Sequence, residues 1–267
     1  MLDILIFSKN RPLQLQGLIK SLLHYSNVDS KKINVLYKYD DQYLEGINNL
    51  KYIHQEINFI KETDFNKQVK EFLGNGEKFC SFFVDDIIVK DNFDFTVPCK
   101  ILELNPHIMT FSLKLGTHLT FCYTLNSNQL VPNGVINSGI FIWNWKNSQH
   151  DWNYPLSLDG HIFRKSDIES WSSHLSFKNP NQYESQLQSV RSNFVMPDIC
   201  CSFLKSKIFN LPLNRVQNEF QNRCEDISID DLYELWKSKK EIDYLKFENF
   251  MNKSVHEPLS LPLVSRK

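Results

Sequence analysis

The first 25 residues combine a short apolar run with a helical pattern of leucines. Residues 4–7 are all apolar, which is typical of a strand buried on both faces. A polar loop follows, and Pro12 suits a first helical turn because its missing N–H costs nothing there. Apolar residues then recur at helical spacing as far as Leu23. This pattern predicts a strand, a loop and an amphipathic helix, the opening of a βα unit.

The next segments continue the alternation. Residues 33–39 and 79–84 are predicted strands, and residues 51–53 a short one. Asp64 is a favoured N-cap for the helix that follows it, and Gly74-Asn75-Gly76 ends that helix. These glycines do not form a dinucleotide-binding fingerprint, because the third glycine is missing and they follow a helix. The first 90 residues therefore predict a parallel sheet covered by helices.

The second half of the chain has a more mixed pattern. Its predicted strands cover residues 108–115, 135–145 and 161–164. Its predicted helices cover residues 167–175, 182–192, 215–222 and 230–239, and the tail from His256 onward is expected to be extended. Ser228, placed before two aspartates, is a good helix start.

Composition narrows the function classes. A hydrophobic fraction of 42% can build a core, and a net charge of -1 argues against a dedicated nucleic-acid binder. Only 8 of 267 residues are glycine, about 3% against a usual share of about 7%, which argues against glycine-rich phosphate loops. The six cysteines form no CxxC pair, so we expect reduced, buried thiols in a cytosolic protein. Neither a signal peptide nor a membrane-spanning stretch is expected.

Polar residues follow two of the predicted strands. Ser8, Lys9 and Arg11 follow the first, where a helix N-terminus favours anions. Asp85 and Asp86 follow the strand at residues 79–84. Adjacent carboxylates repel each other, and a divalent cation such as Mg²⁺ or Mn²⁺ relieves that repulsion. In an open α/β sheet ligands bind at the carboxyl ends of the strands, so these groups predict a site for a metal and a diphosphate. The alternative is an acidic pair that ends a strand and faces water.

These motifs resemble a known family. Residues 4–23, ILIFSKNRPLQLQGLIKSLL, resemble the opening of GT-A glycosyltransferases, and FFVDDIIV resembles their DxD region. The resemblance implies an α/β fold of the GT-A (Rossmann-like) type, with a mixed, mainly parallel sheet flanked by helices, in a family 2-like nucleotide-diphospho-sugar transferase. This sequence reads Asp85-Asp86-Ile87 in place of Asp-x-Asp. Asp86 is favoured as the ligand of Mn²⁺ or Mg²⁺, with Asp85 on the metal or the ribose and His256 as a further ligand.

The resemblance also implies the remaining site residues. Glu184 or Asp159 would act as the general base in an inverting reaction, or would stabilise an oxocarbenium-like state in a retaining one. The alternative for Glu184 is a solvated helix residue. The residues expected to contact the nucleoside diphosphate sugar are Phe7, Ser8, Lys9, Arg11, Asp85, Gly139 and Gly160. Core packing is expected for most of Trp143, Trp145, Trp152, Tyr154 and Trp171, with some lining an acceptor groove, and Cys224-Glu225-Asp226 is interpreted as structural.

The implied function is transfer of a sugar from a nucleoside diphosphate sugar to a hydroxyl of a glycan or lipid-linked acceptor. We expect one domain over residues 1–267, in which residues 1–100 bind the donor and residues 101–267 bind the acceptor. A sugar nucleotidyltransferase and a non-catalytic sugar-binding module of the same fold are the alternatives. The composition suggests an AT-rich bacterial genome and, by analogy, a role in surface polysaccharide synthesis. The expected location is the cytoplasm, including peripheral contact with the inner face of the membrane; no nucleic-acid partner is expected, and the oligomeric state stays open.

Overall fold

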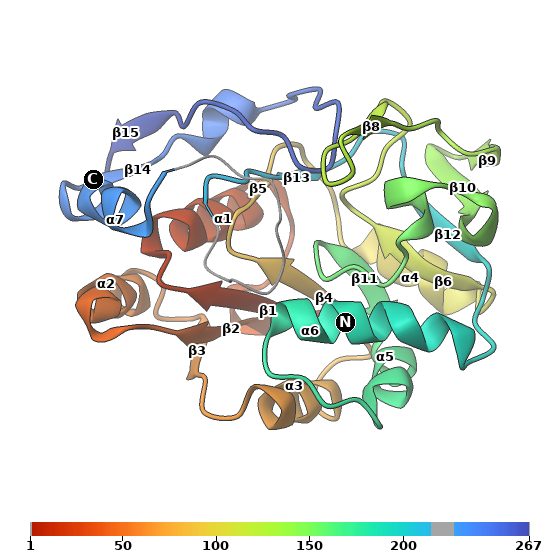
Figure 1. Ribbon diagram of the computed structural model, residues 1–267, viewed down its shortest axis with the longest axis horizontal. Helices are drawn as coiled ribbons and strands as arrows, with labels where there is room; N and C mark the ends of the chain where they lie inside the picture. Colours follow the sequence, from red (N-terminus) through yellow and green to blue (C-terminus); the bar gives the residue numbers. More distant parts are fainter. Residues whose placement is uncertain (1, 215–226, 267) are drawn as a thin grey trace.

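A central sheet organises the protein, as seen in a computed structural model that describes residues 2–214 and 227–266. Within these residues nine strands form one sheet (Figure 1). Seven of them run in one direction, and two run in the opposite direction. This confirms the predicted mixed, mainly parallel α/β sheet. In spatial order the strands are β3 (Asn58–Lys61), β2 (Ile33–Lys38), β1 (Leu2–Lys9), β4 (Phe79–Val84), β11 (His161–Arg164), β6 (Ile108–Ser112), β12 (Ile199–Phe203), β10 (Ile140–Asn144) and β9 (Gly134–Asn137).

Helices cover both faces of this sheet. One hydrophobic cluster takes in α1 (Pro12–Tyr25), α2 (Leu44–Ile53), α4 (Thr96–Leu104) and α7 (Ile229–Lys237). The other takes in α3 (Phe65–Leu73), α5 (Lys165–Ser172) and α6 (Pro180–Ser189). Short strands pair outside the sheet: β5 (Ile87–Val89) with β13 (Ile208–Asn210), β14 (Lys240–Ile242) with β15 (Leu263–Ser265), and β7 (Phe121–Cys122) with β8 (Ser127–Asn128).

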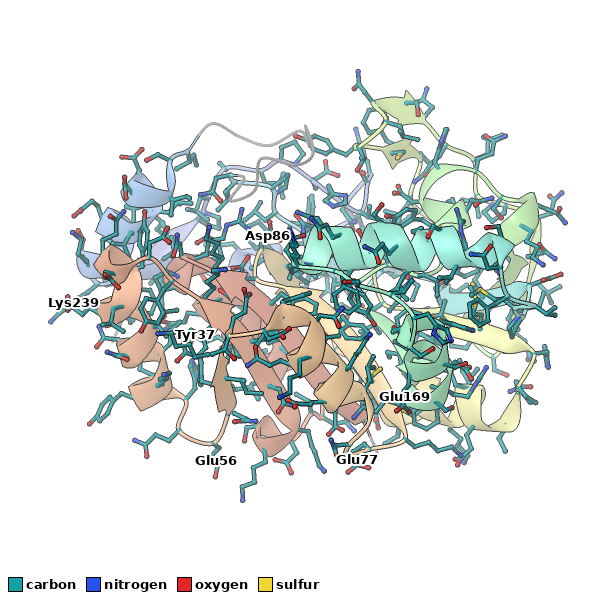
Figure 2. All side chains as sticks on the ribbon, turned by 60° about the horizontal axis from the view of Figure 1, so that its bottom comes forward. Tyr37, Glu56, Glu77, Asp86, Glu169 and Lys239 are labelled. Carbon is teal, nitrogen blue, oxygen red and sulfur yellow. The ribbon has the colours of Figure 1, made fainter. Side chains whose placement is uncertain are left out.

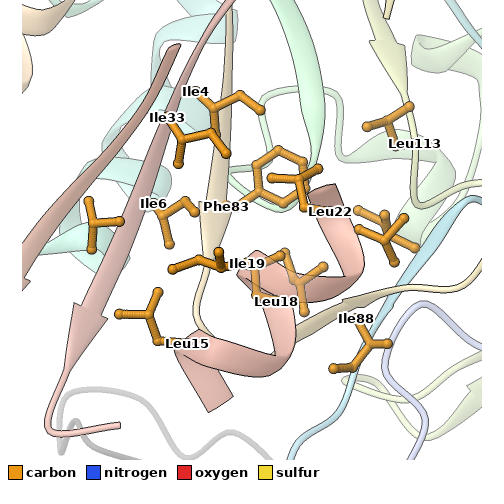
Figure 3. Packing of buried hydrophobic residues seen from close by; sticks show 14 of the residues in the cluster. Ile4, Ile6, Leu15, Leu18, Ile19, Leu22, Ile33, Phe83, Ile88 and Leu113 are labelled. Carbon is orange, nitrogen blue, oxygen red and sulfur yellow. The ribbon is translucent and has the colours of Figure 1, made fainter. Parts of the chain in front are cut away.

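Strand β1 shows why the first apolar run is a buried central strand. Successive side chains of a strand point to opposite faces. Ile4 and Ile6 therefore pack into the cluster beneath α1, where Figure 3 shows them beside Leu18 and Ile19. Leu5 and Phe7 belong to the cluster on the other face. Burial on both faces explains why the strand is apolar without alternation.

The predicted helix starts at Asp64 and Ser228 are confirmed. The Asp64 carboxylate accepts a hydrogen bond from the Lys67 N–H at 3.0 Å at the start of α3. The Ser228 hydroxyl oxygen accepts one from the Asp231 N–H at 3.0 Å at the start of α7. Each side chain satisfies a backbone donor that the first helical turn leaves free.

Two predicted strands are wrong in detail. Residues 51–53 end helix α2, whose inward residues are Ile47 and Leu50, while Tyr52 is 77% exposed. Residues 135–145 contain two strands, β9 and β10, because Ser138 and Gly139 have positive φ and form a hairpin turn. The predicted helix at residues 215–222 and Cys224-Glu225-Asp226 lie outside the described residues.

Other expectations concern burial. Within the described residues, the cysteines are free and buried, in agreement with the prediction: they are Cys80, Cys99, Cys122, Cys200 and Cys201. Trp143, Trp145, Trp152 and Trp171 are buried in the cluster that α6 covers, so core packing is confirmed for them. Strands from both predicted halves of the chain belong to the same sheet. No described helix has the length and hydropathy that crossing a membrane requires.

Candidate active site

The basic loop after β1 and the acidic pair after β4 meet at the end of the sheet where these strands have their carboxyl ends. Strands β1 and β4 are parallel neighbours, so the residues after them lie side by side. The Arg11 Nη1 atom donates to Asp85 Oδ1 at 2.9 Å and to Asp86 Oδ2 at 3.1 Å. Figure 2 shows Asp86, which follows β4, near the middle of the view, and Glu77, which precedes β4, at the lower rim. The predicted juxtaposition of Arg11 with the two aspartates is therefore present in the structure.

Asp85 is held on all sides by the first loop. Its Oδ2 atom accepts hydrogen bonds from the Ser8 hydroxyl at 2.7 Å and from the Lys9 N–H at 3.3 Å. Together with Arg11, these donors occupy both of its oxygens, and the residue is 3% exposed. Asp85 thus fixes the shape of the loop.

Asp86 is the more available carboxylate of the pair. Its Oδ1 atom accepts a hydrogen bond from Asn210 Nδ2 at 2.7 Å, and its side chain is 13% exposed. Burial raises the pKa of Asp86 to about 6, because desolvation and the nearby Asp85 and Asp159 outweigh Arg11 and Asn210. Additional positive charge beside Asp86 would therefore be favourable.

A second charged cluster contains both predicted catalytic carboxylates. Asp159 Oδ2 lies 3.4 Å from Lys114 Nζ and 3.8 Å from His256 Nε2. Glu184 Oε1 accepts hydrogen bonds from the Ser157 hydroxyl at 2.9 Å and from the Leu158 N–H at 2.8 Å.

The two carboxylates have opposite electrostatic environments. Burial opposes ionisation of Asp159, but Lys114 and His256 outweigh it and hold the pKa of Asp159 below its usual value. Burial and the neighbouring Asp159 raise the pKa of Glu184. The two neighbouring carboxylates therefore differ in proton affinity, with Glu184 the higher of the two.

The sheet topology brings the two clusters together. Strand β11 runs antiparallel between β4 and β6, so its amino end lies at the carboxyl ends of those strands. Asp159 comes just before β11, and Lys114 comes just after β6. Between them, the Gly160 N–H donates to the Phe82 carbonyl at 2.7 Å and the Gly160 carbonyl accepts from the Leu113 N–H at 3.0 Å.

Three predicted donor-binding residues have other surroundings. The Phe7 ring is buried against Phe65 and Phe82 in the core. Gly160 has φ +67°, and a Cβ there would lie 2.1 Å from the Ile208 side chain, so this glycine is needed for packing. Gly139 lies in the β9–β10 turn, four strand positions from β4, which is roughly 19 Å at about 4.8 Å per strand. The structure does not bring Gly139 together with the Asp pair.

Of the two aspartates, Asp86 is the one that could hold a divalent cation: its oxygens also accept hydrogen bonds from Arg11 and Asn210, but its side chain is 13% exposed. Asp85 is engaged by Ser8, Lys9 and Arg11, and the His256 ring faces Asp159. Over residues 2–214 and 227–266, no three His, Cys, Asp or Glu side chains are grouped as a metal site. Mg²⁺ and similar ions are commonly held by one or two carboxylates with substrate phosphates and water. A single carboxylate on a bound diphosphate satisfies that chemistry.

Three further residues contact the carboxylates of the site without having been predicted: Lys114, Ser157 and Asn210. Lys114 is the lone cation in an apolar run, IMTFSLKLG, and that break was a signal available in the sequence. Ser157 and Asn210 carry no such signal, because their roles follow from contacts with Glu184 and Asp86 across the fold.

The chain is similar to known glycosyltransferases. It is 27% identical to the bifunctional glycosyltransferase pgtA of Dictyostelium discoideum over 294 aligned residues. The alignment covers 95% of this chain and 38% of pgtA, so the chain spans well under half the length of that relative. No family model matches the chain.

Two solved glycosyltransferase structures match the chain at TM-scores below 0.5. S. aureus TarS 1-349 in complex with UDP-GlcNAc has a TM-score of 0.48 at 14% identity, covering 89% of this chain and 64% of that one. The mannosyltransferase PcManGT from Pyrobaculum calidifontis, in complex with GDP-Man and Mn²⁺, has a TM-score of 0.41 at 10% identity, covering 75% and 56%. The sequence match to pgtA supports the resemblance indicated by the first loop and the Asp pair. In sequence, the chain is therefore similar to a glycosyltransferase, and its sheet is of the mixed, mostly parallel type that the sequence predicts.

Proposed function

We propose that the protein is a glycosyltransferase that moves a sugar from a nucleoside diphosphate sugar to an acceptor hydroxyl. The observation that carries the proposal is the cluster of Arg11, Asp85 and Asp86 at the carboxyl ends of β1 and β4, one strand away from Asp159. The sequence similarity to a glycosyltransferase over almost the whole chain supports it.

Charge balance supports a diphosphate ligand with a divalent cation. Lys9 and Arg11 carry two positive charges and Asp85 and Asp86 two negative ones, so this cluster sums to zero. A nucleoside diphosphate sugar brings about two negative charges, which a divalent cation at Asp86 would offset. Such a cation would supply Lewis-acid stabilisation of the departing diphosphate.

The protein's own groups bind the donor beside the cation. Helix α1 is 14 residues long, and the free N–H groups of its first turn favour an anion near Lys9. Arg11 is committed to the two aspartates, and it holds Asp86 in place. We assign Lys9 to the diphosphate and Arg11 to the positioning of Asp86.

Asp159 fits the role of general base better than Glu184. Its carboxylate lies beside Lys114 and one strand away from the Asp pair, where it can accept the proton of an acceptor hydroxyl as that oxygen attacks the sugar. The Oε1 atom of Glu184 accepts hydrogen bonds from the Ser157 hydroxyl and the Leu158 N–H, so Glu184 holds the turn that carries Asp159. This assignment corresponds to the inverting option.

The proposal also covers the acceptor and the cellular role. The acceptor is a hydroxyl of a glycan or lipid-linked acceptor, which the resemblance to GT-A enzymes supports. A role in bacterial surface polysaccharide synthesis at the cytoplasmic side of the membrane is proposed by analogy with GT-A enzymes.

The test is a panel of nucleoside diphosphate sugars incubated with the protein and Mn²⁺, and then with a chelator. Donor binding is measured by calorimetry and donor hydrolysis by release of the nucleoside diphosphate. We expect one donor to be bound and slowly hydrolysed. Asp86→Asn should weaken the metal-dependent part of donor binding, whereas Asp159→Asn should lower turnover and leave donor binding intact. If no donor binds in either condition and both variants behave as the wild type does, the proposal is wrong. Formation of a sugar nucleotide from a nucleoside triphosphate would favour the nucleotidyltransferase instead.

A further inference from the structure

Lys114 is a buried lysine that the proposed donor site does not use. It lies two residues beyond β6, and it is 5% exposed. A buried ammonium group is costly unless it is paired and hydrogen-bonded. Its Nζ atom donates to the Ser157 hydroxyl at 2.6 Å and lies 3.4 Å from Asp159 Oδ2.

Two hydrogen bonds fix the backbone directly before this side chain. The Leu113 N–H donates to the Gly160 carbonyl at 3.0 Å, and the Leu113 carbonyl accepts from the Lys207 N–H at 2.7 Å. Lys114 is thus attached to a paired segment, and Asp159 lies next to the other partner of that pair. The ammonium is held by the sheet against the turn formed by residues 157–159.

One hydroxyl extends the contact to the second carboxylate. Ser157 accepts a hydrogen bond from Lys114 and donates one to Glu184 Oε1 at 2.9 Å. The Asp159 N–H also donates to the Ser157 oxygen, at 3.3 Å. Lys114 therefore touches Asp159 directly and Glu184 through a single side chain.

We propose that Lys114 is a positioning residue that holds the 157–159 turn and fixes the orientation of the Asp159 carboxylate. The role of Asp159 as the proton acceptor rests on the proposed function. Without the ammonium, two neighbouring buried carboxylates lose their shared counter-charge, and the turn loses one of its two anchors. The carboxylate then leaves the geometry that proton transfer requires.

The structure offers a matched control. Lys90 is 1% exposed, and its Nζ atom donates to the Ser206 carbonyl at 2.7 Å. Within the part of the chain that the structure describes, Lys90 makes no hydrogen bond or ion pair with Ser157, Asp159 or Glu184. Lys90→Met removes a buried ammonium of the same kind away from the turn, so it reports the cost of losing such a group alone.

The first measurement is steady-state transfer by wild type, Lys114→Met, Lys114→Arg and Lys90→Met. We expect Lys114→Met to lower kcat on the order of 10²-fold with the donor KM within about threefold, since a positioned base contributes that much. Lys114→Arg should recover part of the loss, and ethylamine should restore part of the activity of Lys114→Ala. Lys90→Met should keep kcat within about twofold, even where it lowers the melting temperature. A kcat for Lys114→Met near that of wild type, or losses that follow melting temperature alone without amine rescue, would overturn the proposal.

A second measurement does not depend on turnover. The Leu158 N–H is hydrogen-bonded to Glu184, so its hydrogen exchange reports whether the turn is held. We expect exchange at Leu158 to be at least about tenfold faster in Lys114→Met and unchanged in Lys90→Met. Unchanged exchange in Lys114→Met refutes the positioning role. Wild type without any transferase activity, but with this exchange effect, would refute the proposed function and leave the anchoring of the turn established.

Discussion

Replacing Arg11 by Met should be among the most damaging single changes in the protein. Arg11 is 6% exposed and contacts two carboxylates whose side chains are 4% and 13% exposed. Methionine fills similar space but leaves both aspartates buried without their cation. Breaking a buried ion pair from one side costs about 3–5 kcal/mol, against a total stability of about 5–15 kcal/mol for a typical domain. The Nη2 hydrogen bond to the Asn214 carbonyl is lost as well.

The assay is urea unfolding at pH 7.5, followed by tryptophan fluorescence. The control is Lys38→Met, which removes an ion pair with Glu62 of similar length, 3.0 Å, whose lysine is 55% exposed. Exposed pairs contribute about 0–1 kcal/mol, so Lys38→Met should change the free energy of unfolding by less than about 1 kcal/mol. The double variant Arg11→Met with Asp85→Asn should be more stable than Arg11→Met alone, because it removes one of the unpaired charges.

The result that would refute this reasoning is a cost for Arg11→Met no larger than that for Lys38→Met. Water would then solvate the two aspartates once the guanidinium is gone, and the acidic pair would be an exposed strand end. An additive double variant would point the same way, because independent sites add and coupled charges do not.

Two further predictions concern Gly160 and His161. Gly160→Ala should lower the free energy of unfolding in urea by about 2–4 kcal/mol, since it adds left-handed backbone strain and a 2.1 Å clash with buried Ile208. Gly139→Ala, at φ +80° with open space around it, should lower it by about 1–2 kcal/mol. Equal costs for the two variants would contradict the packing argument. Burial, aided by Lys114, lowers the pKa of His161 to about 3. The unfolded chain then binds more protons below about pH 6.5, so the stability from neutral His161 is complete above that pH and is lost progressively as the pH falls toward 3. Wild type should lose about 2 kcal/mol more than His161→Gln between pH 7 and pH 5, and parallel pH curves for the two proteins would contradict this.

The sheet was predictable where burial leaves a clear pattern. Strands β1 and β4 are apolar on both faces, and proline after the first loop marks the start of α1. The segment at residues 51–53 shows the limit. Its three residues suit a strand or a helix equally, and only the preceding Ile47 and Leu50, which face the core, decide for a helix. Helix/strand ambiguity is expected for short apolar runs.

The candidate site was predictable in its first half only. Arg11 and the two aspartates follow strands that the sequence predicts, so their meeting needs no knowledge of long-range pairing beyond a parallel sheet. Lys114 meets Asp159 only because β11 enters between β4 and β6 in the opposite direction. The sequence has no signal for that order, since strand pairing depends on the whole fold.

Strand β11, which lies between β4 and β6, also explains how the Asp86 half and the Asp159 half of the proposed site can be held in fixed positions. Asp86 follows β4, and Asp159 precedes its neighbour β11, so the two residues lie at the same end of adjacent strands. Gly160 ties both neighbouring strands to the turn that carries Asp159 through two backbone hydrogen bonds. In a direct displacement, the proton acceptor and the departing diphosphate would lie on opposite sides of the reacting sugar carbon, with the reacting atoms about 3–3.5 Å apart. Here the relative placement of Asp86 and Asp159 is set by sheet hydrogen bonds rather than by loops, and Arg11 and Lys114 then orient the two carboxylates.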